Sequence, residues 1–514
     1  GVLGIERSVI GVNSNFFELG GHSLKAAILA ARIYKELNVN VSLSEIFKRP
    51  TIEGLSGYIK GAAVNKYVSI EPVEKKEYYP LSSAQKRMYI LQQMAVGVTN
   101  YNMPAAFVLS GVLDIERLEG TFGKLIERHE SFRSSFEWKG NEPVQRINQE
   151  NYKLQIKNTI KNFIRPFDLA KAPLLRVGLI KEGEQKHILM VDMHHIVLDG
   201  TSMSVLIKEF MAVYAGEEQR PLKLQYKDFA VWQNKLLETG EIKKQEQYWL
   251  NRFKGNIPSL DIPTTYPRSP VQDFAGDSIT FSAGDEVAGY LKKLAQETGS
   301  TLFMVLLAAY NVLLYLYTGQ EDIVVGTPVV GRVHPDLDKV IGMFANTLAL
   351  RNYPHPDKTF RFFLEDVKEN SLKAFENQDY QFEMLIEVLG YRRDTTDNPL
   401  FDTMFALQNM SIPGIKLKGL ELTPYQLTSL TSHFDILLEG EEKDGDIIFS
   451  LEYRVGLFEK SVMETLTLHF INILKEIVKN PGIEIAKIEM RSQDEREKIV
   501  QFNNLNEGET YEFD

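Results

Sequence analysis

MHHIVLDG, residues 193–200, is the stretch that decides the fold of the larger part of this 514-residue chain. The run 188–196 is mostly apolar and predicts a buried strand, and an apolar stripe from Met203 to Tyr214 predicts a helix that ends at Gly216. A strand, a loop and a helix in this order are typical of α/β folds, whose ligand and reaction sites collect at the carboxyl ends of strands. The loop with the two histidines is therefore the first candidate for a functional site.

Adjacent side chains on a strand point to opposite faces, so one of His194 and His195 faces a given cavity and the other packs. His195 and Asp199 can approach each other across a turn, although the aspartate can equally pair with a distant arginine. Thr201 or Ser202 can cap the following helix. The alternative that both histidines are hydrogen-bonded strand residues with only a structural role stays open. A metal site is not expected, because two adjacent histidines without a carboxylate cluster coordinate poorly.

The alternation of helices and strands continues on both sides of this loop. A very apolar helix is predicted over 302–316, and a β-branched strand follows it over 323–330. Four prolines cluster between residues 255 and 275, where a change of structural unit is expected. We therefore expect an α/β domain made of two halves, 78–258 and 259–502.

The beginning of the chain has a different pattern, and we expect a small α-helical bundle over residues 1–62. Apolar residues recur at helical spacing over 24–37, and Thr51 can cap a last helix that Gly61 ends. Residues 63–77 have no clear period and are rich in charge. This composition predicts a linker.

The segment FFELGGHSL, residues 16–24, is the second candidate site. Gly20 and Gly21 clear side chains from around the hydroxyl of Ser23, which opens a helix. Unpaired N–H groups and the positive end of the helix dipole suit an incoming phosphate there. The alternative is that Ser23 only caps the helix. A catalytic pair with His22 is not expected, because sequence neighbours rarely reach the required geometry.

The composition excludes several classes of function. With 58 Lys and Arg against 69 Asp and Glu, the net charge is −11, which does not favour nucleic acid as a partner. The absence of cysteine excludes disulfides, thiol nucleophiles and thiolate metal sites. No apolar run approaches the roughly 20 residues needed to span a bilayer, and no signal pattern opens the chain. We expect a cytoplasmic protein without a membrane partner, and, because no Met begins the sequence, a piece of a longer chain.

FFELGGHSL resembles the signature of the peptidyl carrier domains of nonribosomal peptide synthetases, over residues 1–62. The resemblance implies that Ser23 carries a 4′-phosphopantetheine arm. It also implies a separate phosphopantetheinyl transferase, which attaches the arm from coenzyme A.

HHxxxDG at 194–200 resembles the active-site motif of condensation domains and of chloramphenicol acetyltransferase-like acyltransferases. Companion motifs follow in family order across 78–402. They are SxAQxRM at 82–88, RHExLRxxF at 128–136 with Phe132 in place of Leu, YxDxAxW at 226–232, IGxFxNTxxxR at 341–351 with Ala345 where Val is common, NQDxxFE at 377–383 with Gln381 where Pro is usual, and RD with NPLFD at 393–402.

The resemblance implies a tunnel between the two chloramphenicol acetyltransferase-like halves and amide bond formation within it. His195 would accept a proton from the attacking α-amine or aim that amine, and the Gly200 amide would add positive potential for the oxyanion. His194 would support the site, and Asp199 would orient the loop through a salt bridge.

Three arginines are candidates for structural ion pairs: Arg128, Arg133 and Arg351. Arg133 and Arg351 are also the two candidates for the partner of Asp199, and the sequence does not choose between them.

The expected partners follow from the order of the units. The carrier would present the donor acyl group, and a downstream carrier the acceptor, within a larger synthetase that includes adenylation domains and upstream and downstream modules. Residues 503–514 would form a tail or a connection to a downstream adenylation domain. We expect a monomer and a donor of L configuration. An epimerization domain and a non-catalytic docking platform stay open as alternatives.

Overall fold

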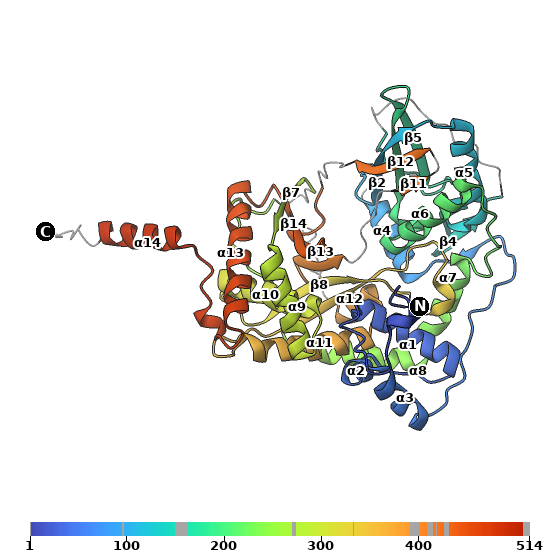
Figure 1. Ribbon diagram of the computed structural model, residues 1–514. Coiled ribbons are helices and arrows are strands. Elements are labelled where there is room, and N and C mark those ends of the chain that lie inside the picture. Colours follow the sequence, from blue (N-terminus) through green and yellow to red (C-terminus); the bar gives the residue numbers. More distant parts are fainter. Residues whose placement is uncertain are drawn as a thin grey trace.

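The computed structural model describes residues 2–94, 97–149, 163–269, 274–332, 334–390, 400–408, 415–417, 419–425 and 431–506. A small helical unit at the N-terminus precedes a larger α/β part built around separate sheets (Figure 1). The first residues of the motif at 393–402 and residues 507–514 of the expected tail lie outside the described residues.

The N-terminal unit is a small α-helical bundle, as expected. It contains a 3-10 turn and three helices, η1 (Arg7–Val9), α1 (Ser23–Leu37), α2 (Leu43–Lys48) and α3 (Ile52–Gly61). Thr51 caps α3, because its side chain accepts a hydrogen bond from the Gly54 amide at 3.1 Å, which confirms the predicted cap. The buried residues of the bundle include Phe16, Ala26, Val41 and Ile46.

The first half of the α/β part is organised on a five-stranded sheet in the order β11–β12–β2–β6–β5. The strands are β2 (Asn102–Gly111), β5 (Leu175–Lys181), β6 (Lys186–His194), β11 (Ile415–Leu417) and β12 (Leu420–Tyr425). Alternate residues of β6 face opposite sides, so Leu189 and Val191 join one apolar core and Ile188 and Met190 another. This two-sided burial explains why the strand is an almost continuous apolar run.

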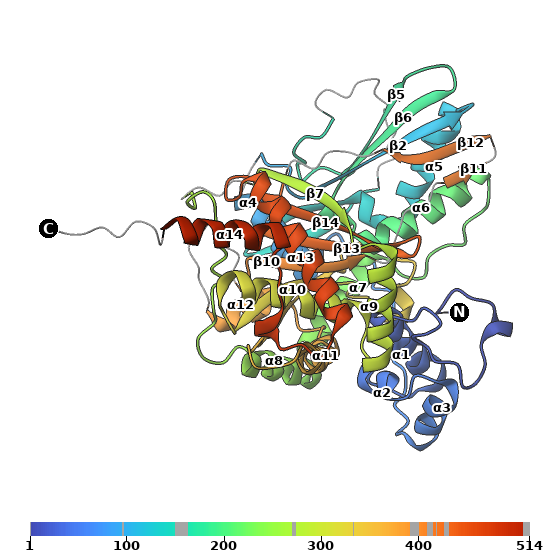
Figure 2. The same ribbon diagram turned by 60° about the vertical axis from the view of Figure 1, so that its left-hand side comes forward.

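Two helices, α5 (Ile115–Arg128) and α6 (Gly200–Ala215), cover one face of this sheet (Figures 1 and 2). Gly216 ends α6 in the left-handed region at φ 90°, as the sequence predicts. Three further helices of this half are α4 (Ser83–Met94), α7 (Tyr226–Leu237) and α8 (Gly240–Arg252). A three-stranded sheet contains β1 (Tyr79–Pro80), β3 (Ser134–Lys139) and β4 (Glu142–Ile147), and 3-10 turns are η2 (Glu130–Arg133) and η3 (His195–Val197).

The second half has a six-stranded sheet in the order β7–β14–β13–β10–β8–β9, with parallel pairing of β10 to β8 and to β13. Its strands are β7 (Gly276–Ser282), β8 (Ile323–Val329), β9 (Asn346–Asn352), β10 (Thr403–Gln408), β13 (Ile436–Lys443) and β14 (Asp446–Arg454). Its helices and 3-10 turns are α9 (Asp285–Thr298), α10 (Leu302–Thr318), η4 (Pro335–Leu337), α11 (Phe360–Glu376), α12 (Phe382–Leu389), α13 (Lys460–Lys479), η5 (Ile485–Lys487) and α14 (Gln493–Asn506). The apolar helix α10 is buried over most of its length, which explains its composition.

Two segments of the second half cross to the first. Strand β12 pairs with β2 from Leu420 opposite Gly111 to Tyr425 opposite Ala106. Val340 and Phe344 also join the apolar core of the first half. The division at residue 258 stays a prediction, and these two crossings tie the halves together.

The N-terminal bundle lies against the second half. Lys35 of α1 forms a salt bridge of 2.9 Å with Asp336 of η4, and the Ser44 amide of α2 donates to Glu376 of α11 at 3.1 Å. Both views show α1 and α2 close to α11 (Figures 1 and 2).

Among the described residues, no single helix has the length and apolar composition needed to cross a membrane. One pair, Asp285–Glu297 and Leu302–Thr318, meets that criterion together, with a bend of 108° between its two helices.

Candidate active site

The chain turns sharply at the two histidines. Strand β6 ends at His194, and His195 begins the turn η3, so the two side chains leave the sheet in different directions. The His195 amide donates to the carbonyl of Tyr101 at 2.8 Å, which ties the turn to the start of β2. The loop is therefore fixed by the neighbouring strand as well as by its own residues.

The hydrogen bond of His195 determines which of its ring nitrogens is available. Nδ1 lies 2.8 Å from the carbonyl oxygen of Leu198. A carbonyl can only accept, so Nδ1 carries the hydrogen, and in the neutral ring Nε2 keeps its lone pair. The half-buried His195 thus offers a basic nitrogen whose ring orientation is set by the backbone of its own loop.

His194 is buried and has a different environment. Its Nδ1 accepts a hydrogen bond from the Ile196 amide at 3.1 Å, and its Nε2 lies 3.5 Å from Oε1 of Gln92. Burial, together with the nearby His195 and Arg176, lowers the pKa of His194 to about 3. His194 is therefore neutral and packed, which agrees with a supporting position.

Asp199 has an architectural position at the start of α6. It is 2% exposed, and its Oδ1 accepts from the Ser202 amide at 2.7 Å, so Asp199 is the N-cap in place of the predicted Thr201 or Ser202. Its Oδ2 accepts from the Phe344 amide at 3.0 Å, which reaches it from the second half.

The salt-bridge partner of Asp199 is Arg332, at 3.5 Å, so both sequence candidates, Arg133 and Arg351, were wrong. Nη1 of Arg332 also donates to the carbonyls of Leu337 and Val340, at 2.7 and 2.6 Å. The guanidinium is buried, and burial lowers its pKa despite the attraction of Asp199. The sequence missed this pair because Arg332 follows β8, on a loop that only the tertiary fold brings beneath α6.

The three expected structural arginines have other partners. Arg128 holds Glu209 of α6 through two hydrogen bonds, of 2.8 and 3.2 Å. Arg351 holds Asp322 through bonds of 2.8 and 2.6 Å, and these raise its pKa. Arg133 donates to the backbone carbonyls of residues 126, 127 and 148 at 2.7–3.2 Å, so the contacts found for it fasten η2 to the chain rather than to a carboxylate.

Gly200 is the first residue of α6 and is exposed. A Cβ built on it meets no atom within 4 Å. A side chain at this position would therefore find open space.

Ser23 is the first residue of α1, and the preceding His22 occupies the N-cap without a side-chain hydrogen bond. The Ser23 hydroxyl is buried and has no hydrogen-bond partner, so it does not cap the helix or pair with His22. A Cβ on Gly21 would lie 2.4 Å from the ring of Phe16, so this glycine is required by a close approach. An orphaned hydroxyl at a helix N-terminus fits the point of attachment of a phosphate group.

The two candidate sites do not share their surroundings. Burial and the charge of Lys25 lower the pKa of His22 to about 4, whereas Glu442 of β13, in the second half, acts to raise it. His195 instead contacts Tyr101 and Leu198 of the first half.

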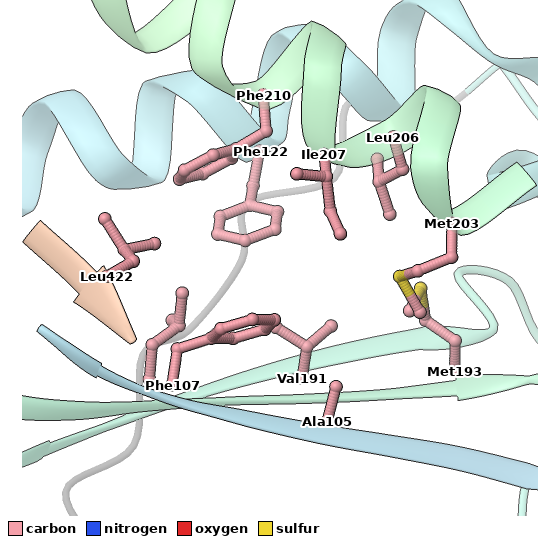
Figure 3. Close-up of a pocket in the computed structure, with 11 residues that line it drawn as sticks. Ala105, Phe107, Phe122, Val191, Met193, Met203, Leu206, Ile207, Phe210 and Leu422 are labelled. Atoms are coloured by element: carbon pink, nitrogen blue, oxygen red, sulfur yellow. The ribbon is translucent and has the colours of Figure 1, made fainter. Parts of the chain in front are cut away.

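An apolar cavity of about 40 Å³ lies between the five-stranded sheet and α5 and α6 (Figure 3). It is lined by apolar side chains alone, with Met193 and Met203 at the end of the cavity that belongs to the histidine loop and the start of α6. A cavity of this character stays dry, so it has no polar chemistry of its own.

A group of three or more His, Cys, Asp or Glu side chains that could hold a metal ion is not found among the described residues.

Two family descriptions match this chain. Residues 75–500 match the condensation domain family, and residues 1–59 match the family of phosphopantetheine attachment sites. The second match gives the N-terminal bundle its cofactor, a covalently attached 4′-phosphopantetheine.

The chain is similar to segments of large synthetases. Bacitracin synthase 3 of Bacillus licheniformis is 48% identical over 508 residues, which are 97% of this chain and 8% of that protein. Gramicidin S synthase 2 of Brevibacillus brevis is 48% identical over 515 residues, which are 98% of this chain and 12% of that protein. This chain thus spans 8–12% of the length of these curated relatives.

Solved structures share the fold. The X-domain from teicoplanin biosynthesis superposes with a TM-score of 0.76 at 23% identity, over 82% of this chain and 100% of that one. The four-domain nonribosomal peptide synthetase AB3403, bound to AMP and glycine, has a TM-score of 0.75 at 22% identity, over 84% of this chain and 35% of that one. The match over residues 75–500 establishes that the chain belongs to the condensation domain family, with a phosphopantetheine attachment domain ahead of it.

Proposed function

We propose that this chain forms an amide bond in nonribosomal peptide synthesis. The donor acyl group is held on Ser23, and the acceptor is the α-amine of an aminoacyl group on a downstream carrier. The observation that carries the proposal is the hydrogen bond from Nδ1 of His195 to the Leu198 carbonyl, because it leaves Nε2 free to accept a proton.

When attached, the phosphopantetheine arm supplies the thioester that makes the acyl group reactive. The α-amine has a pKa near 8, so a sizeable fraction of it is already neutral at pH 7. Nε2 of His195 accepts the proton that the nitrogen loses as the C–N bond forms, or holds the amine in line for attack. The C–S bond breaks, and protonated His195 returns the proton to the departing sulfur.

Negative charge develops on the carbonyl oxygen during the attack. The Gly200 amide, at the N-terminus of α6, supplies positive potential for this oxygen, since the helix begins five residues after His195. Asp199 and Arg332 take no part in the chemistry in this proposal. They hold the loop and the start of α6 in place.

We propose a phosphopantetheinyl transferase, adenylation domains and neighbouring carrier domains as partners, Ser23 as the attachment residue, a tunnel between the halves, an L donor, the cytoplasm as location and a monomeric state. The synthetase relatives support the class of partner, because this chain matches only a segment of each.

The test is a transfer assay followed by intact mass. Ser23 is loaded from L-phenylalanyl coenzyme A by a transferase, and a separate carrier domain loaded with an amino acid is added. The proposal expects a dipeptide on the added carrier, and none from Ser23→Ala.

The alternatives give different results in the same assay. Loading without transfer, across several pairs of amino acids, would overturn the proposal in favour of a docking platform. Epimerization leaves the mass unchanged, so the loaded residue is also released by hydrolysis and resolved on a chiral column. Its conversion from the L to the D form, without a gain of mass on the acceptor, would establish an epimerization domain instead.

A further inference from the structure

His433 lies on the segment between β12 and β13 and connects the second half to the first. Its backbone is anchored in the second half, where the Arg454 guanidinium donates to the His433 carbonyl at 3.0 Å and pairs with Asp435 at 3.3 Å. Its ring reaches across to the first half, where Nε2 donates to the carbonyl of Asn100 at 2.9 Å.

The residue that follows Asn100 connects this contact to the proposed base. The ring of Tyr101 stacks on the ring of His433, with centroids 5.7 Å apart and planes at 25°. The carbonyl of the same Tyr101 accepts the His195 amide at 2.8 Å. From the opposite half, His433 therefore holds Asn100 and the next residue, Tyr101, whose carbonyl fixes the backbone of His195.

His195 is also one of the groups that affect the ionisation of His433. Burial lowers its pKa, and the nearby His195, Arg454 and Arg87 lower it further, against the bond to Asn100. A neutral ring with its hydrogen on Nε2 suits both the bond to Asn100 and stacking on Tyr101.

We propose that His433 is a positioning residue for the condensation reaction. It clamps the Asn100–Tyr101 backbone across the boundary between the halves, and so keeps His195 in the orientation that proton transfer requires. The inference rests on the proposed function. It adds a residue outside the histidine motif, from the other half, to the groups that set the geometry of the reaction.

Three variants of the full chain test the clamp. His433→Ala removes both contacts, whereas His433→Gln restores an N–H donor for the Asn100 carbonyl. The matched control is His469→Ala. His469 is also a hydrogen-bonded histidine beside a tyrosine, with its ring 5.7 Å from that of Tyr317, but it lies on α13.

The first measurement is hydrogen exchange at the His195 amide, which reports the bond to Tyr101 and does not need transfer activity. We expect at least tenfold faster exchange in His433→Ala, near-normal exchange in His433→Gln, and no change in His469→Ala. Unchanged exchange in His433→Ala would overturn the proposal.

The second measurement is the rate of transfer at saturating acceptor carrier. We expect the rate to fall about 10- to 100-fold in His433→Ala, because a displacement of the catalytic group by about 1 Å can lower a rate 100-fold. The concentration of acceptor carrier that gives half the maximal rate should not change. His433→Gln should recover most of the rate. Faster exchange with a normal rate would also overturn the positioning role. A wild-type chain that transfers nothing would instead refute the proposed function. The hydrogen exchange of the His195 amide would still test whether His433 holds the loop.

Discussion

The orientation of His195 depends on backbone carbonyls rather than on a partner side chain. Its amide is held by Tyr101 and its Nδ1 by Leu198, so the ring presents Nε2 without a carboxylate behind it. The motif at 194–200 was enough to select the residue from the sequence. The tautomer was not predictable, because it depends on how the loop turns after β6.

The pair of Asp199 and Arg332 gives a stability prediction. Both side chains are buried, at 2% and 5% exposed, so removing one charge leaves the other unpaired. We expect Asp199→Asn to lower the free energy of unfolding by about 3–5 kcal/mol in urea titrations. The control is Asp168→Asn, whose carboxylate is 53% exposed and pairs with Lys171, itself 80% exposed, so its loss should cost about 1 kcal/mol or less. Equal losses in the two variants would contradict a buried role for the pair.

His194 gives a prediction on pH. Its folded pKa of about 3 lies below its unfolded value of 6.5, so below pH 6.5 the unfolded chain binds a proton that the folded chain does not. Stability that is present above pH 6.5 is therefore lost as the pH falls toward 3, by about 1.4 kcal/mol per pH unit.

From pH 6.5 to pH 5, this contribution amounts to about 2 kcal/mol. We expect His194→Gln to lose correspondingly less stability than the wild type over that interval, as measured by urea unfolding. The exposed His355 serves as the control, and His355→Gln should follow the wild type. A wild-type slope in His194→Gln would show that the ring is not kept neutral by burial.

At the scale of elements, the spacing of apolar residues predicted the strands and helices whose formation depends on local sequence. The strand before the histidine loop, the helices α6 and α10, and the cap and end of α3 agree with the structure, because apolar spacing and terminal residues determine them. The crossings were not predictable. Strand β12 and the loop before β9 join the first half through pairings between distant parts of the chain.

One of these crossings depends on a glycine. A Cβ on Gly342 would lie 1.8 Å from the ring of Tyr226, which is buried on α7 and bonded to the Ser82 hydroxyl at 2.7 Å. We expect Gly342→Ala to destabilise the fold by about 1–3 kcal/mol, because the loop and the ring must separate.

The matched control is Gly289→Ala, within helix α9, where an added Cβ meets no atom within 4 Å. It should be neutral or stabilising by up to about 1 kcal/mol, since alanine favours a helix. Thermal unfolding of both variants measures the difference. Equal unfolding temperatures of the two variants would mean that the loop at Gly342 accommodates the added Cβ without loss of stability.

At the scale of the whole molecule, the N-terminal bundle is docked on the second half with the Ser23 hydroxyl buried. A salt bridge as exposed as that of Lys35 contributes about 1 kcal/mol or less, so reversing this charge changes the balance between the docked and free positions by a comparable amount. We expect Lys35→Glu, which repels Asp336, to shift the bundle toward the free position.

The measurement is the rate at which a phosphopantetheinyl transferase modifies Ser23 with coenzyme A. Lys35→Glu should raise that rate about two- to fivefold, since 1.4 kcal/mol corresponds to a factor of ten. Lys48→Glu is the control, because Lys48 pairs with Glu45 of its own helix and not with the second half. The same rate in all three chains would show that docking does not cover the serine.

The central claim is that Nε2 of His195 handles the proton of the attacking amine. The measurement that tests it most directly is the rate of dipeptide formation on an acceptor carrier, by intact mass, for the wild type and His195→Ala with Ser23 fully loaded. The account predicts a fall of about 100- to 10,000-fold in the variant, with loading of Ser23 unchanged. Formation of the dipeptide at the wild-type rate by His195→Ala would contradict both proton acceptance and positioning by this residue.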